Sequence, residues 1–473
     1  MTAARPSLEI RNPANGSVIT TVPMASADDV DGLVAHARAV FASGAWSGLA
    51  PRDRGAALMR LATLMERDAE LLARLDSEDA GKPITECRDG DIPGAIDTIR
   101  WFAEAADKLT TENFATPPDI LAFTEREPFG VVAAILPWNY PLAMTAWKVG
   151  PALAAGNCLI LKPADATPRS ALHLASLAAE AGIPAGVLHV ATGDGPVTGA
   201  ALATHPGIGA ISFTGSTRTG RAVLAAAASS NLKRVSLEMG GKSPHIVMGD
   251  ALEFGDALID GIAEAAFLTS GQNCTAGSRV LVHESLYDEV VERLGAAARS
   301  LVLGDPADRE TQLGPVINDA AADRILAEIA GAVSRGARVV AGGEEVAVVP
   351  GGRYIPATVL AELANDDPIL FTEIFGPVTT VQSFSTREEA IAMANAVDYG
   401  LAATVWTKNI DDALAVARGV EAGIVSVGAY SEGDLTVPFG GWKMSGFGGA
   451  EKSLGAFRQW TREKSIWIQL QGQ

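Results

Sequence analysis

Cysteine and histidine are scarce in this chain, and their scarcity excludes several classes of protein. Three cysteines (Cys87, Cys158 and Cys274) and six histidines are spread over 473 residues. An odd number of widely spaced cysteines does not suggest a disulfide framework, and no spacing resembles a metal knuckle. The sequence therefore predicts neither a disulfide-stabilised secreted domain nor a metal site.

Basic side chains are also few. The chain has 37 lysines and arginines against 56 acidic residues, a formal charge of −19. Nucleic acids and anionic membrane surfaces are bound by basic patches, so neither is an expected partner. The net charge does not oppose a phosphate-bearing cofactor, because helix N-termini and single lysines form such sites locally.

Long hydrophobic runs are absent as well. Residues 129–161 come nearest to one, but Pro137, Lys148 and Asn157 interrupt them. They therefore indicate buried strand, loop and helix instead of a membrane span. The first residues, Met1 to Pro6, lack the apolar core of an export signal. We expect a cytoplasmic protein.

The chain does contain a long alternation of short apolar strands and amphipathic helices. Its length suggests two or three domains. Strand and helix signals alternate from residue 131 to residue 237, which predicts a doubly wound α/β domain, and a second α/β series runs from residue 244 to residue 427. Two exposed strands are predicted near residues 120–124 and 465–470. Their backbone N–H and C=O groups need a neighbouring strand, so the two could pair with each other.

One cysteine lies in an unusual setting. Cys274 occurs in Gly-Gln-Asn-Cys-Thr-Ala-Gly-Ser-Arg, residues 271–279, directly before an apolar strand. The flanking glycines allow a tight turn and the close approach of a ligand, so the thiol could be presented to a substrate. The alternative is that Cys274 is a small buried hydrophobic residue, as free cysteine often is.

Four other short stretches follow predicted strands, at the edge where parallel sheets bind ligands. Gly215, in a Gly-x-x-x-x-Gly turn ending at Gly220, suits a pyrophosphate at a helix N-terminus, although such turns are common without one. Lys162 and Asp165 could hold ribose hydroxyls or form a surface ion pair.

The other two stretches carry groups that could take part in a reaction. The Asn139 amide, between two prolines, could donate to a developing oxyanion or simply belong to a turn. Glu238 stands before two glycines, where it could be a general base or a solvated loop residue.

Taken together, these stretches resemble one known family. Asn139, Lys162, Gly215, Glu238 and Cys274, each in its motif, match the aldehyde dehydrogenase superfamily, in the family's motif order and over roughly residues 10 to 470. Glu-Ile-Phe-Gly-Pro at residues 373–377 and Pro-Phe-Gly-Gly at residues 438–441 match it too.

The resemblance implies an α/β fold in three parts. A variant Rossmann domain for the cofactor would comprise residues 1–109 and 129–239, and a catalytic α/β domain residues 240–450. A small β flap for oligomerisation, from residues 110–128 and 451–473, would give a homodimer or homotetramer.

The resemblance also implies a mechanism. The Cys274 thiolate would attack the aldehyde, Asn139 and the Cys274 backbone N–H would hold the oxyanion, and Glu238 would activate the water that hydrolyses the thioester. Lys148 joins them as a catalytic residue. The implied cofactor site consists of Trp138, Lys162, Asp165, Gly215, Ser216, Gly220, Glu373 and Phe375. Because Asp165 lies where the ribose would bind, we expect NAD to be preferred over NADP.

The substrate is less closely specified. Residues 434–441 and 452–454 look most like the branch that oxidises ω-amino and γ-glutamylamino aldehydes, so an aminoaldehyde is predicted. Aliphatic or aromatic aldehydes and semialdehydes are the alternatives. The family's Ser-Gly-x-Gly-Arg-acid motif is altered after Ser445: the arginine is missing and one residue is inserted before Glu451, near the family's substrate entrance.

Three rival functions remain. Cys274 could work with His283 in a thiol hydrolase, although no third group orients the histidine in a known spacing. The chain could be a non-catalytic NAD-binding relative, which the presence of Cys274, Glu238 and Asn139 together disfavours. It could also pass its thioester to coenzyme A, which a water-activating Glu238 disfavours.

Overall fold

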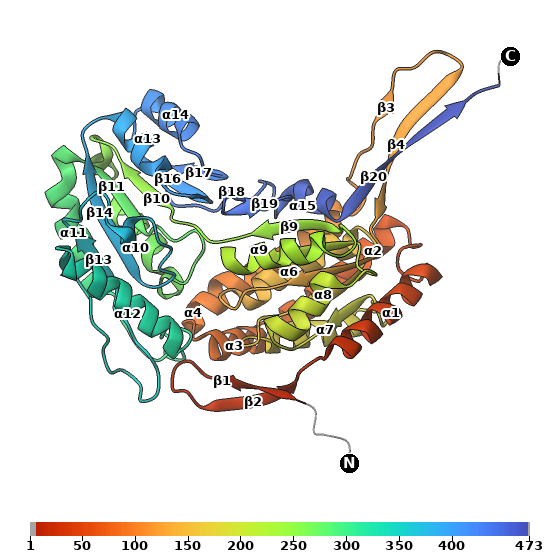
Figure 1. The fold of residues 1–473 in the computed structure, drawn as a ribbon, viewed down its shortest axis with the longest axis horizontal. Coiled ribbons are helices and arrows are strands. Elements are labelled where there is room, and N and C mark those ends of the chain that lie inside the picture. Colours follow the sequence, from red (N-terminus) through yellow and green to blue (C-terminus); the bar gives the residue numbers. More distant parts are fainter. Residues whose placement is uncertain (1–5, 472–473) are drawn as a thin grey trace.

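The computed structural model describes residues 6–471, which form two large sheets with their helices and a projecting β arm (Figure 1). Residues 1–5, on which part of the argument against an export signal rests, and residues 472–473 lie outside the described part. Within residues 6–471, no helix has both the length and the hydropathy to cross a membrane.

The first sheet is the predicted doubly wound sheet. Its strands lie in the order β19-β9-β8-β5-β6-β7, and all neighbouring pairs are parallel except that of β19 with β9. Every residue of β5 and β6 is buried, as expected of apolar strands covered on both faces. The strands are β5 (Val131–Ile135), β6 (Cys158–Lys162), β7 (Leu188–Val190), β8 (Ala210–Thr214), β9 (Arg234–Glu238) and β19 (Gly446–Phe447).

Two layers of helices cover this sheet. One layer holds α6 (Pro141–Ala154) and α7 (Arg169–Glu180), backed by α2 (Pro51–Arg67), α3 (Ala69–Ala80) and α5 (Ile92–Ala105). The other holds α1 (Ala27–Ser43), α8 (Ala200–Thr204) and α9 (Thr217–Ala228). The helix α1 begins with a capping box formed by Ser26 and Asp29.

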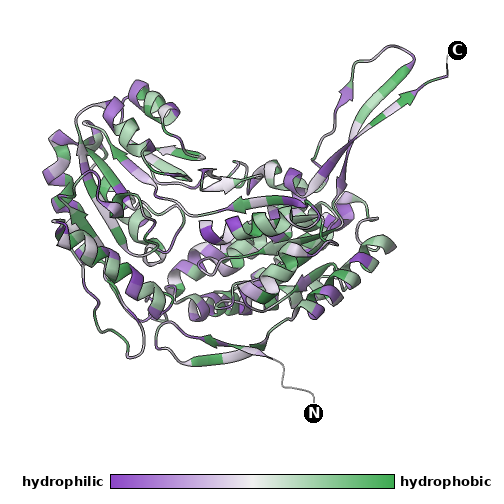
Figure 2. Ribbon diagram, in the orientation of Figure 1, coloured by the Kyte–Doolittle hydropathy of each residue, from purple (hydrophilic) through white to green (hydrophobic). Residues whose placement is uncertain are grey.

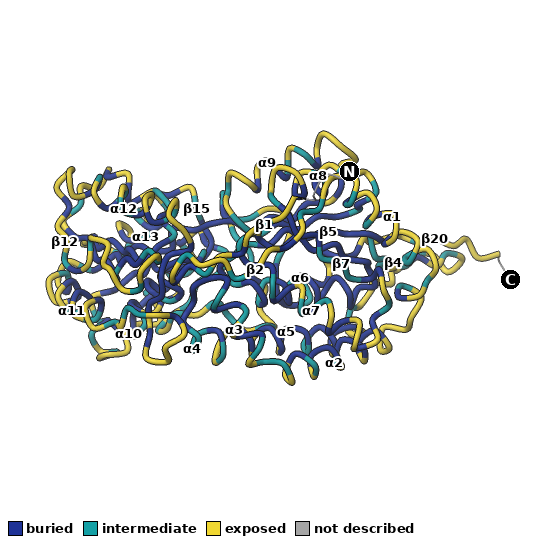
Figure 3. Tube along the Cα trace, turned by 90° about the horizontal axis from the view of Figure 1, so that it is seen from below, coloured by how far each residue is buried: buried dark blue, intermediate teal, exposed yellow. Residues whose placement is uncertain are grey.

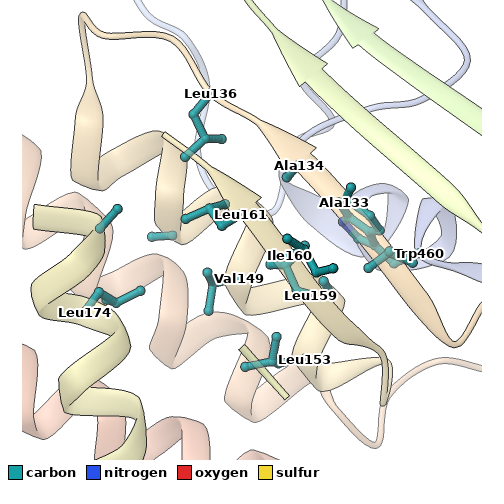
Figure 4. Close-up of a cluster of buried hydrophobic side chains, with 14 of the residues drawn as sticks. Ala133, Ala134, Leu136, Val149, Leu153, Leu159, Ile160, Leu161, Leu174 and Trp460 are labelled. Carbon is teal, nitrogen blue, oxygen red and sulfur yellow. The ribbon is translucent and has the colours of Figure 1, made fainter. Parts of the chain in front are cut away.

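The core of this half lies between the sheet and these helices, where Figure 3 shows the chain as mostly buried. Apolar side chains of β6 gather with Val149 and Leu153 of α6 and Leu174 of α7 (Figure 4). The late helix α15 (Ser453–Gln459) and Trp460 belong to the same core, so the C-terminal segment returns to the first sheet.

The second sheet is also mainly parallel. It runs in the order β12-β13-β14-β11-β10-β16-β17, and only β12 is antiparallel to its neighbour. Its helices include α10 (Asp256–Phe267), α11 (Tyr287–Ser300), α12 (Asp319–Ser334), α13 (Arg387–Asn395) and α14 (Ile410–Gly419). Its strands are β10 (Pro244–Val247), β11 (Arg279–His283), β12 (Arg338–Ala341), β13 (Thr358–Ala361), β14 (Val378–Phe384), β16 (Ala402–Trp406) and β17 (Ile424–Val427).

A three-stranded arm completes the fold. The strand β20 (Thr461–Gln469) pairs antiparallel with β4 (Ile120–Pro128), which also pairs with the short β3 (Asn113–Phe114). The predicted pairing of the two exposed strands is therefore confirmed within one chain, with Ile468 opposite Leu121. The arm projects from the body and carries apolar side chains along β4 and β20 (Figures 1 and 2). The division of the chain into three domains stays a prediction.

Three smaller elements lie at the edges of these layers. The strands β1 (Ser7–Arg11) and β2 (Val18–Pro23) form a separate antiparallel pair, and β15 (Tyr399–Gly400) pairs with β18 (Trp442–Lys443). A short helix α4 (Ile84–Glu86) continues into a π-helical turn at Cys87–Asp91. This turn lies between α3 and α5.

Candidate active site

The strand order of the first sheet brings two of the predicted stretches together. From β5 the chain proceeds to β6 and β7 on one side, then returns to place β8 on the other side of β5. The carboxyl ends of β5 and β8 therefore flank the point where ligands bind in such sheets. Trp138 and Asn139 follow β5, and Gly215 and Ser216 follow β8.

The loop that carries Cys274 has an unusual backbone. Thr269, Ser270 and Gly271 are left-handed in succession, with φ of 55°, 53° and 65°. A glycine is required at the third position, because a Cβ there would lie 2.1 Å from the Gly376 carbonyl oxygen. Strain of this kind persists only where neighbours hold it. The Glu86 carboxylate accepts hydrogen bonds from the Thr269 N–H and hydroxyl, the latter at 2.9 Å.

Cys274 is partly exposed, whereas Cys87 and Cys158 are buried. Burial of its surroundings raises the pKa of the Cys274 thiol well above its ordinary value, and the charges of Glu432, Glu373 and Glu238 raise it further. The Asn139 amide lies against the same loop and donates to the Gln272 carbonyl oxygen at 2.8 Å. The structure thus brings Cys274, Asn139 and Glu238 together.

Glu238 ends β9, and its carboxylate forms no ion pair with any residue of the described part of the chain. Its side chain is 5% exposed, and Oε2 is buried without a hydrogen-bond partner among the described residues. Burial raises the pKa of Glu238 well above its usual range, and the charge of Glu451 adds to this, while Lys148 and the Gly441 backbone oppose it. A carboxylate that ionises at higher pH is a stronger base.

Lys148 lies near Glu238 and pairs with Glu451. The two side chains form a fully buried ion pair, to which the Ser212 hydroxyl adds a contact of 3.5 Å to Oε1 of Glu451. Glu451 belongs to the altered loop after Ser445, so the acid of the family motif is retained in a buried position even though the arginine is absent. Lys148 can act on the site only through these carboxylates.

The residues expected to hold the adenosine and pyrophosphate fit a dinucleotide. The Thr214 hydroxyl, at the end of β8, is buried without a hydrogen-bond partner among the described residues. Lys162 makes one hydrogen bond, to the Pro163 carbonyl at 3.1 Å, which leaves two donors free, and burial lowers the pKa of its ammonium. Asp165 is exposed just beyond it. Ser216 caps α9, and Gly220 lies in the first turns of α9, where a Cβ would meet the Met239 sulfur at 2.5 Å.

Glu373 and Phe375 close the site from the second sheet. Oε1 of Glu373 accepts a hydrogen bond from the Gly241 N–H at 3.2 Å, and burial raises the pKa of Glu373 to about 7. Gly240 is needed beside it, since a Cβ there would lie 2.1 Å from the carboxylate. The rings of Phe375 and Trp138 meet edge to face with centroids 5.5 Å apart. These side chains join the two sheets where a nicotinamide ribose would lie.

Sequence reasoning missed a second group of residues near the thiol. Tyr430 and Glu432, on the loop after β17, contact Asn273 and Thr275 on either side of Cys274. Lys452, Trp147 and Phe439 lie close to the same loop. The sequence feature that could have indicated these residues is Tyr-Ser-Glu at residues 430–432. It lies shortly before residues 434–441, which were compared with the aminoaldehyde branch.

The structure separates the two residues of the hydrolase rival. His283 is the last residue of β11, whereas Cys274 precedes the first residue of that strand. The His283 ring is engaged with Ser285 at 2.8 Å and with Phe384. A cysteine–histidine pair therefore does not form.

Comparison with known proteins agrees with this geometry. A model described as "Aldehyde dehydrogenase family" matches residues 1–466. The chain is 44% identical to an aminoacetaldehyde dehydrogenase of Pseudomonas aeruginosa, over 97% of this chain and 91% of that protein. It is also 44% identical to the NADP/NAD-dependent aldehyde dehydrogenase PuuC of Escherichia coli, over 99% and 94%. A crystal structure of indole-3-acetaldehyde dehydrogenase with NAD⁺ superposes with a TM-score of 0.96 at 45% identity, over 98% of this chain and 93% of that one.

A thiol, a buried carboxylate and strand-to-helix turns that fit a dinucleotide, between two mainly parallel sheets, suit an oxidoreductase that uses a nicotinamide cofactor. The chain belongs to the aldehyde dehydrogenase family. It is an NAD(P)-dependent enzyme that oxidises aldehydes.

The different exposure of the three thiols predicts selective alkylation. Iodoacetamide should modify Cys274 alone in the native protein, because the other two thiols are buried. The thiolate is the reactive form and the pKa is raised, so the rate should still be rising with pH at pH 9. Peptide mass spectrometry of samples labelled from pH 6 to pH 9.5 measures this, with Cys274→Ala as the control. First modification at Cys87, or a rate that levels off below pH 8, would contradict the description of the site.

Proposed function

We propose that Cys274, Asn139 and Glu238 carry out the oxidation, with Lys148 supporting Glu238. One observation carries the proposal: a partly exposed thiol stands on a strained, firmly held loop, bonded through Gln272 to Asn139 and close to a carboxylate without an ion-pair partner. A nucleophile, an oxyanion donor and a base within one site match what acyl transfer through sulfur requires.

The reaction begins with the thiolate of Cys274. Its sulfur bonds to the aldehyde carbon, and the carbonyl π electrons move to the oxygen, giving a thiohemiacetal oxyanion. The Asn139 amide and the Cys274 backbone N–H hold that charge. Preorganised donors of this kind typically contribute about 3–4 kcal/mol.

Oxidation then converts the thiohemiacetal into a thioester. The nicotinamide of NAD(P)⁺ supplies the chemistry of this step, because it accepts a hydride, that is, one proton and two electrons. Asn139 keeps the oxygen oriented as the carbonyl re-forms. Cys274 retains its bond to carbon throughout.

Glu238 completes the cycle as a general base. It removes a proton from water, the oxygen bonds to the thioester carbon, and the carbon–sulfur bond breaks to release the carboxylic acid and the Cys274 thiolate. The charge of Glu451 strengthens this base and that of Lys148 moderates it. Burial raises the basicity of Glu238 most, and the buried ion pair adjusts it further.

For the cofactor we propose the predicted set of residues and a preference for NAD. Lys162 and Asp165 would hold the adenosine ribose, Gly215, Ser216 and Gly220 the turn under the pyrophosphate, and Trp138, Glu373 and Phe375 the nicotinamide end. The exposed Asp165 carboxylate supports NAD, because a 2′-phosphate would bring further negative charge beside it.

We propose an aminoaldehyde as substrate, in line with the aminoacetaldehyde dehydrogenase among the relatives. Aliphatic, aromatic and semialdehyde substrates are the alternatives. The working thiol must be reduced, which supports the cytoplasm as its location.

We further propose that the arm assembles subunits into a homodimer or homotetramer. Both faces of its sheet are apolar: Leu121, Phe123, Ile466 and Ile468 lie on one, and Phe114, Ala122 and Trp467 on the other. Trp467 is 65% exposed and Phe114 45%. Apolar surface on both faces of a projecting sheet fits a contact with another subunit.

The first test separates the two halves of catalysis. Glu238→Gln keeps the shape of the side chain but removes the base, so hydride transfer should proceed while thioester hydrolysis slows by about a hundredfold or more. Stopped-flow absorbance should show a burst of NADH close to one per active site, followed by slow turnover. Loss of the burst together with the steady state would place Glu238 before hydride transfer and overturn its role here.

The second test concerns the cofactor. At about 4 Å and an effective dielectric near 20, each like-charge pair costs roughly 4 kcal/mol before screening. Because Asp165 is exposed, screening lowers this cost, and we expect NAD to be preferred by about tenfold to a hundredfold in kcat/KM.

Asp165→Ser should reduce the ratio of kcat/KM with NAD to kcat/KM with NADP, mainly by lowering KM for NADP. Asp194→Asn is the matched control, since Asp194 also acts on the charge of Lys162 and asparagine keeps the cap that Asp194 provides. A parent enzyme that prefers NADP, or equal effects of both variants, would show that Asp165 does not contact the ribose.

The third test removes part of the arm. Deleting residues 465–473 takes away half of β20 and exposes the edge of β4, so the oligomer should dissociate. Deleting only residues 471–473 leaves β20 complete and should preserve the assembly. Light scattering coupled to gel filtration gives both masses. An unchanged mass for the longer deletion would mean that the arm does not join subunits.

A further inference from the structure

The loop after β17 meets the nucleophile loop through a small hydrogen-bond network. The Tyr430 hydroxyl accepts a hydrogen bond from the Asn273 amide at 3.1 Å and lies 2.8 Å from the Thr275 hydroxyl. Thr275 also donates to Oε1 of Glu432, and Tyr430 reaches the same oxygen at 3.3 Å. The Glu432 carboxylate is therefore held beside the residue that follows Cys274.

A carboxylate in this position opposes the reaction that the site performs. After burial, Glu432 is the largest cause of the raised pKa of the Cys274 thiol, because its negative charge disfavours the thiolate. A neutral glutamine would accept the same hydrogen bonds without that cost. The presence of a charged group here suggests that the charge itself has a use.

No cation of the described residues forms an ion pair with Glu432, although the charge of Lys452 acts on it from a greater distance. The Lys452 ammonium lies nearby, but it donates to the backbone carbonyls of Glu432 and Gly433, at 3.0 and 3.2 Å, and forms no ion pair with the carboxylate. Other titratable groups with which Glu432 interacts electrostatically are acidic or phenolic: Cys274, Asp91, Tyr140 and Tyr430. The partly exposed carboxylate thus retains a negative charge that a bound cation could balance.

The aromatic rings of Trp147 and Phe439 could also attract a cation, but the Lys452 ammonium already lies against them. Trp147 and Phe439 meet edge to face at 5.3 Å, and the Lys452 ammonium lies 4.9 Å and 5.4 Å from their ring centroids. Aromatic faces bind cations, but here a lysine of the chain takes that place. Because Glu238 and Glu373 are assigned above to water activation and to the cofactor, we assign Glu432 to a positively charged substrate.

We propose that Glu432 is a specificity-determining residue, which binds the ammonium group of a short aminoaldehyde and so lets the substrate itself activate Cys274. The inference rests on the proposed function, in which an aminoaldehyde is the substrate and Cys274 the nucleophile. The ammonium neither gains nor loses a proton. The thiol proton leaves to solvent, and sulfur then bonds to the aldehyde carbon as described above.

The position of Glu432 favours a short substrate. Glu432 accepts a hydrogen bond from Thr275, the residue that follows Cys274. An ammonium group held by this carboxylate would therefore lie near the thiol, so few carbons can separate it from the carbonyl group.

The test compares a cationic substrate with a neutral one of the same shape. 3-Aminopropanal and butanal differ chiefly in an ammonium in place of a methyl group. Glu432→Gln should lower kcat/KM for 3-aminopropanal by about tenfold or more, since a charge-assisted hydrogen bond is lost. The same variant should raise kcat/KM for butanal severalfold, because the thiol then ionises more readily. A fall in kcat/KM for 3-aminopropanal together with a rise for butanal would support the proposal.

A second readout follows the thiol directly. Iodoacetamide should label Cys274 faster in Glu432→Gln than in the parent at pH 7.5, because removing the negative charge lowers the pKa of the thiol. Asp434→Asn is the matched control: it makes the same charge change two residues along the loop, at an exposed acid that bonds to the Thr436 N–H. It should alter each measurement by less than about twofold, since exposed charges are strongly screened.

The outcomes distinguish this inference from the function on which it rests. If the parent oxidises butanal but not 3-aminopropanal, the proposed substrate class is wrong and the inference falls with it. If the parent prefers 3-aminopropanal and Glu432→Gln retains that preference, the substrate class stands and only the role of Glu432 is overturned. Equal losses for both substrates would likewise overturn it, because they would show that Glu432 merely supports Thr275.

Discussion

The active site depends on one junction, the hydrogen bond from the Asn139 amide to the Gln272 carbonyl oxygen. Asn139 follows the central strand of the first sheet, and Gln272 belongs to the loop that feeds the second. The left-handed turn at residues 269–271 brings that loop to the junction, and the contact of Gly271 with Gly376 fixes its other side. A side chain in place of the Gly271 hydrogen would push the nucleophile loop away from Gly376, just where thiol, amide and carboxylate must meet.

Negative charge is the second organising feature. Glu238, Glu373 and Glu432 surround the thiol, and all three make it harder to ionise. The proposed function gives two of them a use that explains the cost, since it places Glu238 as the base near the thioester and Glu373 against a ribose. Within the dry interior such charges act strongly, so a positive charge brought in by cofactor or substrate changes the chemistry of the sulfur as well as the affinity. The same positive charge therefore contributes both to ligand binding and to ionisation of the Cys274 thiol.

Much of the fold and several site residues could be predicted because they obey local rules. The strands at residues 131–135 and 158–162 are continuous apolar runs, and the parallel-sheet rule places whatever follows them at one edge. That reasoning placed Asn139, Lys162, Gly215 and Glu238 at the ends of strands, whereas their roles came from the resemblance to the family and stay predictions.

The rest required contacts between distant residues. The Lys148–Glu451 pair joins positions 303 residues apart, and nothing near either residue indicates its partner. Thr269 and Ser270 have no sequence preference for a left-handed backbone, which is imposed there by Glu86 and Gly314. Glu432 was overlooked because an acidic residue in a polar loop looks ordinary until Thr275 is seen beside it.

The pairing of β4 with β20 has a consequence for how the protein folds during its synthesis. These strands meet across 335 residues at the contact of Arg126 with Thr461, and α15 and Trp460 fill the first core from the same late segment. At about 5–20 residues per second, a ribosome needs roughly twenty to seventy seconds to make the intervening chain. Throughout that time β4 offers a bare edge and the first core lacks its last side chains. The N-terminal half cannot finish folding as it is made, so translation speed and chaperones that shield strand edges should govern the yield of active enzyme.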